Sequence, residues 1–384
     1  MATGTLLYDP RPQLSDANGS PLNGGLLYSY DAGTTTLRPL YQDVTLLTPH
    51  SNPVVLDAAG RAPAGLYASA SPVKLVLKTS TGVTSWTQDN YSPVGLAAIS
   101  STVNNICDGR LTLTSVTPVT TADVTAATTV YWSPFRGNRV ALYDGSAWAV
   151  YSFSELSLPL GSDAANTNYD VFAYNNGGTV AIERLAWSAV TVRATGLVLQ
   201  DGVLVKSGTT TRRYLGTYRT TGTVGQTEDS AAKRFVWNYY NRLPRALRVL
   251  EVTNSWTYTT SIWRQANASA ANQVAVVIGW AEVEVSTEVR GFSSNSSATP
   301  INTSVAIAQD ATNAPTTDCV GRLGHTIASG AAAVNLTATL RTYPSVGYHF
   351  FAWIEYSEAA GTTSWLGDNG GVLIQAGLSG VIEG

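Results

Sequence analysis

Hydrophobic and polar residues alternate with a period of two along much of the chain, as expected for β-strands with one buried face. Residues 73–78, VKLVLK, are the clearest example. Two further apolar runs, 139–143 and 147–151, flank Asp144-Gly145-Ser146. Because glycine accepts the positive φ that a tight turn requires, these runs predict a β-hairpin.

Similar patterns continue to the end of the chain. They predict a hairpin of 169–174 and 179–185, a short strand inside 202–208, a long strand over 347–356 and a last strand over 372–375. Almost every segment therefore has the pattern of a strand or a turn, and the fold class is predicted to be all-β.

Residues 227–242 have the start and stop signals of a helix instead. Small polar residues and two carboxylates open the segment, basic residues lie within it and at its far end, and Pro244 closes it. Phe235, Val236 and Tyr239 share one face at helical spacing. The pattern predicts one helix of about three turns packed against a sheet; an irregular strand is the alternative.

These patterns divide the chain into three predicted domains. Residues 1–97 form a small Pro- and Gly-rich β-domain, 98–192 a middle β-domain with the two hairpins, and 193–384 a jelly-roll-like β-sandwich with the helix. The segment 96–106 is expected to be a short helix or a linker. No repeat of 20–50 residues occurs, which argues against a solenoid or propeller.

The composition favours polar surfaces with little charge. Charged residues make up 13% of the 384 residues, against roughly 25% in typical soluble domains. The net charge is −3 and no basic run occurs, so neither nucleic acid nor a membrane surface is an expected partner. No apolar run approaches the roughly 20 residues needed to span a bilayer, and no signal peptide is recognised at the start. We expect a soluble protein made in a cytoplasm.

Few residues suggest chemistry. Cys107 and Cys319 are far apart in sequence, so we expect two buried free thiols and no disulfide framework. His50, His325 and His349 lie in no metal-binding motif. We expect His349 to be packed and His325 to be the more exposed of the two. No metal or other cofactor is predicted.

No catalytic residue is predicted either. A glycosidase needs two carboxylates about 5–10 Å apart, and the C-terminal part offers several candidates: Glu282, Glu284, Glu288, Asp310, Glu355 and Glu358. Their spacing singles out no pair, and Glu282-Val283-Glu284 alternates as a solvated strand would. No nucleophile elbow or phosphate loop occurs, so we expect a protein that is not an enzyme.

Four short segments occur in a fixed order between residues 23 and 77. They are NGGLLYSYDAGT at 23–34, LYQD at 40–43, NPVVLDAAGR at 52–61 and VKLVL at 73–77. In order and spacing they resemble the head-binding domains of tailspikes from short-tailed bacteriophages. The resemblance assigns the virion-anchoring motif to Gly25, Tyr28, Tyr30, Gly33, Asn52, Pro53, Asp57 and Gly60.

The resemblance implies a small trimeric β-domain that attaches to the phage tail, a connector or an adaptor protein and does no chemistry. It therefore implies a homotrimer located in the virion, as part of the phage tail. Residues 199–208, 211–217 and 234–242 resemble segments of phage and prophage virion proteins whose role is mostly unassigned. The chain as a whole is thus expected to be a tail fibre or tailspike subunit.

The C-terminal domain is expected to face the host. Its aromatic residues should fill the sandwich core and subunit contacts, or else stack on sugars: Trp256, Tyr258, Trp263, Trp280, Trp353 and Trp365. The turn-rich segment 361–371 and the loop 293–299 are the predicted exposed tips. They supply the candidate receptor-facing residues Trp365, Asp368, Asn369 and Asn295.

The resulting hypothesis is attachment within the virion and recognition of a bacterial surface glycan or protein without catalysis. A head fibre, collar or decoration protein with no receptor is the first alternative. A polysaccharide-degrading tailspike is the second. A cluster of arginines, Arg212, Arg213 and Arg219, is expected either to pair with carboxylates between subunits or to form a solvated edge.

Overall fold

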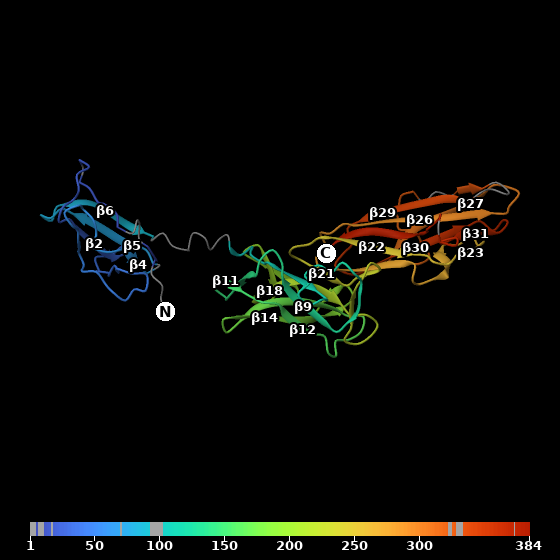
Figure 1. Cartoon of the computed structure of the whole chain (residues 1–384), viewed down its shortest axis with the longest axis horizontal. Helices are drawn as coiled ribbons and strands as arrows, with labels where there is room; N and C mark the ends of the chain where they lie inside the picture. The colour runs from blue at the N-terminus through green and yellow to red at the C-terminus, as the bar shows by residue number, and fades with distance from the viewer. Residues whose placement is uncertain are drawn as a thin grey trace. The chain divides into compact units, whose positions relative to one another are not determined.

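The computed structural model describes residues 5–6, 11–16, 18–69, 71–92, 103–321, 325–327, 333–371 and 373–384. The chain forms two compact units, Met1–Thr102 and Val103–Gly384 (Figure 1). Strands make up nearly all elements, and η2 (Ala266–Ala268) is a single 3₁₀ turn. The predicted all-β class is confirmed. Among the described residues, no helix has the length and apolar character to cross a membrane.

The N-terminal unit is built on a four-stranded antiparallel sheet. Its order is β3 (Val54–Val55), β2 (Leu26–Asp31), β5 (Val73–Lys78) and β6 (Thr84–Tyr91). Two further short strands, β1 (Thr5–Leu6) and β4 (Tyr67–Ala68), pair with each other in a separate antiparallel sheet. The alternation in β5 buries Leu75 and Leu77 in a leucine-rich core, as the sequence pattern predicts.

The second unit begins with three sheets of its middle part. The first is β12 (Leu156–Pro159), β9 (Thr129–Pro134) and β7 (Gly109–Thr112); the second is the hairpin β10 (Arg139–Tyr143) and β11 (Trp148–Ser152). The third has the order β15 (Val192–Arg193), β14 (Thr179–Ala189), β13 (Asn168–Asn176), β18 (Thr209–Arg219), β17 (Val203–Lys206) and β16 (Leu197–Gln200), with β21 (Val236–Asn238) paired to β18. Both predicted hairpins and the short strand β17 are confirmed.

The last part of this unit is a β-sandwich of two sheets. One has the order β28 (His325–Ile327), β27 (Ile301–Gln309), β30 (Gly347–Ser357), β25 (Gln273–Ile278), β20 (Lys233–Arg234), β19 (Thr227–Asp229) and β8 (Val124–Ala127), with β24 (Arg264–Gln265) on β30. The other has the order β22 (Pro244–Leu250), β32 (Gly377–Glu383), β26 (Val285–Asn295), β31 (Thr363–Leu366) and β23 (Ser255–Thr257), with β29 (Val334–Thr342) on β26. The predicted long strand over 347–356 is β30.

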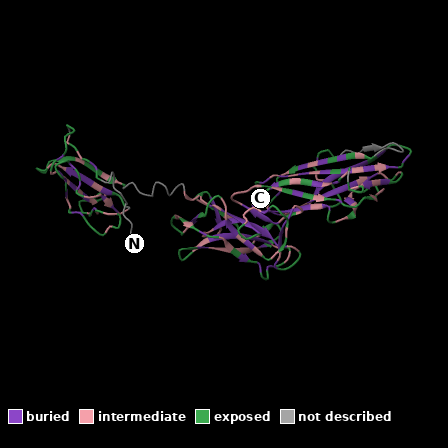
Figure 2. Cartoon of the chain, viewed as in Figure 1, coloured by how far each residue is buried: buried purple, intermediate pink, exposed green. Residues whose placement is uncertain are grey.

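Side chains of the two sheets meet in one core. Trp353 of β30, Val305 of β27 and Val289 of β26 are fully or almost fully buried in it. Trp353 packs edge-on against Trp256 of β23, with ring centroids 6.1 Å apart. Figure 2 shows buried and exposed positions alternating along the long strands, as the period of two requires. The predicted β-sandwich is confirmed.

The predicted helix over residues 227–242 is wrong, because the segment forms β19, β20 and β21. Val236 packs into the core of the middle part, whereas Trp237 packs into the core of the sandwich. All three residues of β21 are buried. A strand covered on both faces loses the alternation that marks a strand in sequence, and the remaining apolar spacing matches a helix by coincidence.

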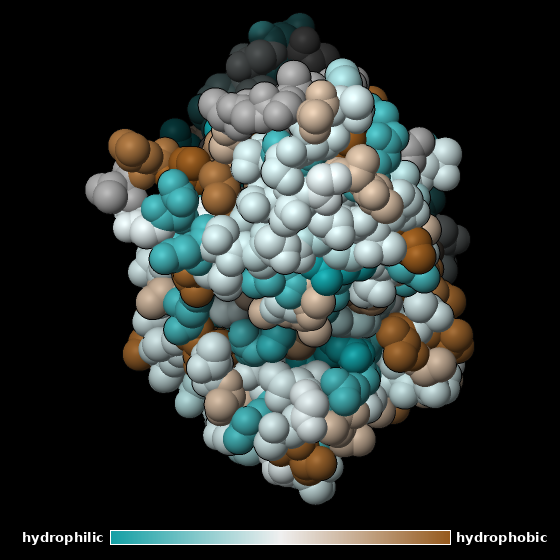
Figure 3. Space-filling view, turned by 90° about the vertical axis from the view of Figure 1, so that its right-hand side faces the viewer, coloured by the Kyte–Doolittle hydropathy of each residue, from teal (hydrophilic) through white to brown (hydrophobic). Residues whose placement is uncertain are grey.

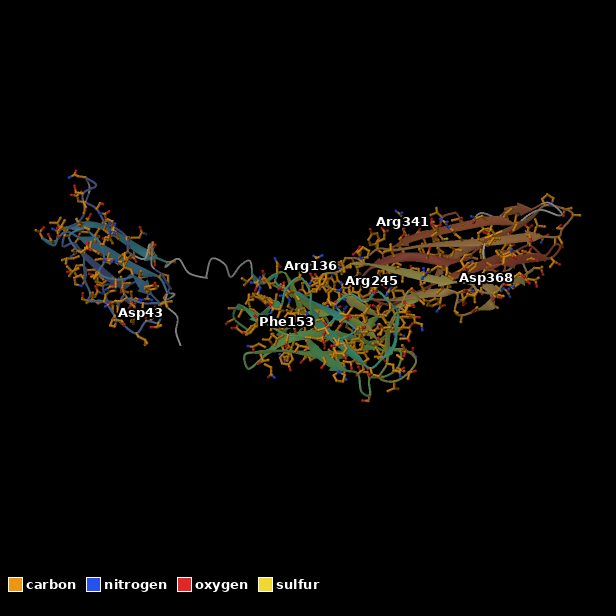
Figure 4. All side chains as sticks on the ribbon, viewed as in Figure 1. Asp43, Arg136, Phe153, Arg245, Arg341 and Asp368 are labelled. Atoms are coloured by element: carbon orange, nitrogen blue, oxygen red, sulfur yellow. The ribbon has the colours of Figure 1, made fainter. Side chains whose placement is uncertain are left out.

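Asp229 links the middle part to the sandwich. Its Oδ1 accepts a hydrogen bond from Arg234 Nη1 at 2.9 Å and its Oδ2 one from Arg245 Nη2 at 2.8 Å. Arg245 lies where the middle sheets meet the sandwich (Figure 4) and also donates to the carbonyl of Thr120. Of the two carboxylates expected to open a helix, Asp229 thus pairs with two arginines, and Glu228 pairs with Lys233 at 3.0 Å.

Two further predictions about the end of the chain differ from the structure. The last strand is β32, Gly377–Glu383, rather than 372–375; Val372 lies outside the described residues. Glu282 and Glu284 lie in a turn and the segment after it, and β26 begins at Val285. Most of the segment 96–106 and the side chain of His325 lie outside the described residues.

The predicted boundary between residues 192 and 193 falls inside the seven-stranded sheet. Strands β13 and β14 precede it and β16, β17 and β18 follow it, and β13 pairs directly with β18. Backbone hydrogen bonds therefore cross this boundary in the middle of a sheet. Residues 103–384 form one compact unit.

Candidate attachment and display sites

Asn52 of the predicted anchoring motif joins two loops to a strand. Its Nδ2 donates to the carbonyl oxygens of Ser29 at 2.7 Å and Arg38 at 3.0 Å, and its Oδ1 accepts from Ser29 N–H at 3.2 Å. Pro53 follows through a cis peptide bond and leads into β3. These contacts satisfy backbone groups beside β2, so the role of Asn52 is to fix the fold.

Asp57 and Gly60 form the turn that follows β3. Asp57 Oδ1 accepts from the N–H groups of Ala59 and Arg61, both at 2.9 Å, which is the geometry of an Asx turn. Gly60 has φ +72°, and a Cβ there would lie 2.4 Å from the carbonyl oxygen of Leu14. Only glycine fits this position.

Gly25 and Gly33 lie at the two ends of β2. Gly25 directly precedes the strand, and the N–H of Gly33 donates to Asp89 Oδ1 of β6 at 2.9 Å. The glycine, asparagine and aspartate positions of the motif thus hold turns in place.

Tyr28 and Tyr30 are different, because they lie on the outer face of the sheet. Both are half-buried, and their rings stack with centroids 6.2 Å apart. On the neighbouring strand β5, Lys78 Nζ lies 5.0 Å from the Tyr28 ring and Lys74 Nζ lies 5.8 Å from the Tyr30 ring. This aromatic and basic face, defined by these four residues, is the surface of the motif available to a partner.

The predicted receptor-facing tip at Trp365 is wrong. Trp365 is fully buried in β31, where it stands opposite Trp256 and packs in the sandwich core. Asn295 is also buried, and its Nδ2 donates to Thr363 Oγ1 at 2.7 Å and to the carbonyl of Ala360. Both side chains occupy inward positions of strands, which the turn residues around them conceal in the sequence.

Asp368 and Asn369 do lie in a surface turn after β31 (Figure 4). Asp368 Oδ1 accepts from the N–H of Gly370 at 3.1 Å, and Asn369 is exposed with φ 47°.

Seen from the end that carries β23, β27 and β31, the surface is mostly hydrophilic or neutral, with hydrophobic residues in small separate groups (Figure 3). This end offers hydrogen-bonding groups rather than a large apolar patch.

The predicted core-filling role of the tryptophans is confirmed. Trp353 and Trp365 are fully buried, and Trp256, Trp263 and Trp280 are partly buried against the same core.

Most of the candidate carboxylates are engaged with neighbouring residues. Glu282 pairs with Arg242, Glu288 with Arg290 at 2.6 Å, and Glu358 accepts from Asn302 Nδ2 at 2.8 Å. Two exposed hydrogen bonds from Asn302 hold the pKa of Glu358 below its usual range. These contacts are those of a solvated surface.

Glu355 of β30 is a fully buried carboxyl group in the sandwich. Its Oε1 accepts from Arg264 Nε at 2.8 Å and from the N–H of Asn267 at 3.2 Å, and its Oε2 accepts from Trp256 Nε1 at 2.9 Å. Burial raises the pKa of Glu355 to about 7, against the opposing effect of Arg264. Both oxygens are occupied by the protein, so the carboxyl group acts as a connector between β30, β24 and β23.

A Ser-His-Asp arrangement, which the sequence analysis missed, joins the end of β27 to the start of β30. His349 Nδ1 lies 2.7 Å from Asp310 Oδ2, and Ser345 Oγ lies 3.5 Å from His349 Nε2. However, Nε2 also lies 2.9 Å from the carbonyl oxygen of Ser345. Since a carbonyl and a carboxylate both accept, these two contacts favour the ring with a proton on each nitrogen.

The carbonyl oxygen of Ser345 lies closer to His349 Nε2 than Ser345 Oγ does, at 2.9 Å against 3.5 Å, so Nε2 is directed at the backbone. Burial alone lowers the pKa of His349, but the hydrogen bond and charge of Asp310 outweigh burial and raise it above its usual range. His349 is buried, as predicted. His349 and Asp310 form an ion pair when the ring is protonated.

The three clustered arginines have three different environments. Arg212 pairs with Glu183 at 3.0 Å. Arg213 is fully buried, with Nη1 donating to the carbonyls of Asn104 and Ala141. Arg219 is buried and lies 4.1 Å from the centroid of Tyr348. A solvated edge, one of the two predicted alternatives, is therefore wrong for Arg213 and Arg219.

Candidate metal ligands and thiols are the last groups to consider. Within the described residues, no three or more His, Cys, Asp or Glu side chains gather as metal ligands would. Cys107 and Cys319 are both free and buried, as predicted, and burial raises the pKa of the Cys107 thiol.

Comparison with known proteins yields structural likenesses only. No protein-family model and no curated protein sequence matches the chain. Solved structures with some likeness include a Bacillus thuringiensis Cry1Da tryptic core variant, at 10% identity and a TM-score of 0.17 over 74% of this chain and 54% of that one. The chain thus spans about half the length of that protein.

In two further solved structures, a larger share of the matched protein aligns with this chain. Infectious bursal disease virus Gx strain matches at 10% identity and a TM-score of 0.20, over 68% of this chain and 69% of that one. A glycoside hydrolase family 43 arabinoxylan arabinofuranohydrolase from Bacillus subtilis matches at 12% identity and 0.18, over 98% and 94%. TM-scores this low carry no conclusion about function.

Proposed function

We propose that the chain is a non-catalytic structural subunit of a tailed bacteriophage particle, a tail fibre or spike. It attaches to the tail or connector through its N-terminal unit and presents the second unit to the bacterial surface. The subunits form a homotrimer located in the virion.

One observation carries the proposal: the motif residues between 23 and 61 fold into a separate compact β-unit. Its Gly, Asn and Asp positions fix turns, as at Asn52 and Gly60. Its two motif tyrosines instead form, with Lys74 and Lys78, the aromatic and basic face. A rigid fold that presents an aromatic surface is what an attachment domain needs.

The carboxylates and the histidine of the second unit support a role without catalysis. Glu355 and His349 are both buried and have protein partners at each polar atom. An enzyme needs an acid or base that can reach a substrate, and these groups face their own strands.

The location in the particle can be tested directly. Gold-labelled antibodies against the chain, applied to phage particles purified from its source, should label the tail in electron micrographs. Label on the head would instead support the head-fibre or decoration alternative. Absence of the chain from purified particles would rule out both.

The mode of attachment is tested by replacing both motif tyrosines. In particles assembled with the Tyr28→Ser, Tyr30→Ser chain, the amount of incorporated chain should fall at least about tenfold, as expected for loss of interface anchors. The matched control is Tyr131→Ser, which alters a partly exposed tyrosine of the second unit. Equal incorporation of all three chains would contradict attachment through this face.

Two solution measurements address the remaining parts. Light scattering should give a mass three times the 40.5 kDa of one chain, and a monomer would contradict the trimer. Incubation with bacterial surface polysaccharide should release no oligosaccharide; release would support the polysaccharide-degrading alternative.

A further inference from the structure

The outer face of the sandwich contains a polar hollow of about 360 Å³ over the paired strands β26 and β29. Its walls are Ser286 and Glu288 of β26, Thr339 and Arg341 of β29, and the segment with Asp318 and Val320. In the sheet register, Ser286 stands opposite Arg341 and Glu288 opposite Thr339. The volume is within the usual range for small-ligand sites, roughly 300–1,000 Å³.

This face concentrates charge in a chain with 13% charged residues. Glu288, Asp318 and Arg341 line the hollow, and Arg341 projects from the outer side of β29 (Figure 4). Glu288 Oε1 also accepts a hydrogen bond from Arg290 Nε at 2.6 Å. Ser286 and Thr339 add hydroxyl groups. The lining therefore offers strong donors and strong acceptors side by side, on paired strands that fix their spacing.

An exposed aromatic ring lies next to the hollow. Tyr343 follows Arg341 by two residues, just beyond the end of β29, and is 68% exposed. Its hydroxyl donates to Glu284 Oε2 at 3.2 Å, which holds the ring across the start of β26. A flat, exposed and anchored ring is the surface on which an apolar sugar face stacks.

We propose that this hollow binds an oligosaccharide, with a sugar ring on Tyr343 and its hydroxyl groups on Arg341, Glu288 and Asp318. Sugar hydroxyls both donate and accept, so they match a lining of mixed donors and acceptors. A protein partner would need an apolar centre, whereas Val320 is the apolar side chain of this lining. A nucleic acid would need a basic surface.

The inference rests on the proposed display role and names its site and its ligand class. The test uses the whole purified chain and an array of purified bacterial surface polysaccharides as the probe. The chain should bind a subset of these glycans. Arg341→Ala and Tyr343→Ala should each weaken that binding at least about tenfold, whereas Tyr343→Phe, which keeps the ring, should retain most of it.

The matched control is Arg248→Ala, which removes an exposed arginine of the same sheet on β22. It should leave binding unchanged, because β22 lies outside the hollow. Equal losses for Arg248→Ala and Arg341→Ala would overturn the site by showing nonspecific attraction to charge. Binding that survives Arg341→Ala and Tyr343→Ala, or binding to no glycan of the array, would also overturn it.

Failure of this inference is distinguishable from failure of the proposed function. A chain that labels the phage tail but binds no glycan through the hollow keeps its structural role and loses this site. A chain absent from the particle loses the structural role whatever glycans it binds. Thermal unfolding of each variant confirms that the exposed substitutions leave the fold intact.

Discussion

Single polar side chains hold together segments that are far apart in the sequence. Arg110 is almost fully buried, and its guanidinium donates to the carbonyl oxygens of Pro118, Asn241 and Gly384. Burial lowers the pKa of Arg110 to about 10, so the side chain stays charged at neutral pH. Leaving buried backbone carbonyl groups unpaired costs free energy of folding. Substituting a side chain that pairs with them should therefore lower the stability of the unit that contains it.

Asn52→Ala should destabilise the N-terminal unit by about 1–3 kcal/mol, because it removes the amide that pairs with Ser29 and Arg38. Hydrogen exchange of the backbone amides of β2 and β5 in the same unit measures the loss. Asn18→Ala, at an exposed turn position, should change the unfolding free energy little. Equal effects of the two substitutions would contradict the structural role of Asn52.

Glu355 should make the second unit less stable as the pH rises. Because its pKa is raised from 4.5 to about 7, the folded state binds the proton more tightly than the unfolded state does. The stabilisation is complete below about pH 4.5 and is lost as the pH rises through about 7. Glu355→Gln keeps the shape without titrating, so it should flatten this part of the profile.

The effect should be on the order of 2–3 kcal/mol between pH 4.5 and 8. Thermal unfolding of both proteins across this range measures it. Glu383→Gln, at an exposed position of β32, should leave the pH profile of the original chain unchanged. A wild-type profile that matches Glu355→Gln at every pH would show that Glu355 does not titrate in this way.

At the scale of elements, strands packed on both faces connect the middle part to the sandwich. Gly216 of β18 pairs with Asn238 of β21, and a Cβ at Gly216 would lie 2.3 Å from the carbonyl oxygen of Trp237. Two backbones approach here more closely than a side chain permits. This contact allows β21 to lie between two cores.

Gly216→Ala should therefore destabilise the second unit by at least about 2 kcal/mol, because one strand must move to make room. Gly222→Ala is the matched control, since no atom lies within 4 Å of a Cβ there. Denaturant midpoints of the two variants measure the difference. Similar midpoints for both would mean that β18 and β21 can separate without cost.

The elements that sequence predicts well are those with one face in solvent. Strand β5 and the hairpin of β10 and β11 follow local alternation and a local turn at Gly145, so their signals lie within a few residues. Strand β21 has no such signal because tertiary packing buries both its faces. The burial of Trp365 is hidden in the sequence for a related reason, because it depends on pairing with the distant strand β26.

The candidate sites also divide into those with a local sequence signal and those that depend on contacts between distant segments. The turn positions of the anchoring motif, such as Asp57 and Gly60, can be recognised from residue types alone. The hollow at Arg341 cannot, because it needs the pairing of β26 with β29 and the approach of Val320. The Ser345, His349 and Asp310 contacts likewise join two strands that are separated by more than 30 residues.

At the scale of the whole molecule, the two compact units should unfold separately. Scanning calorimetry should show two transitions, since each unit has its own core. Asn52→Ala should lower one transition temperature and Gly216→Ala the other. A single transition shifted by both variants would contradict independent units.

The seven-stranded sheet, which draws strands from both sides of residue 193, limits how such genes can recombine. An exchange near residue 102 transfers a complete unit, so both parents' cores survive in the hybrid. After a crossover near residue 193, β13 from one parent would have to pair with β18 from the other, within a single sheet. Mosaic relatives of this chain should therefore have their junctions near the first position and lack them near the second.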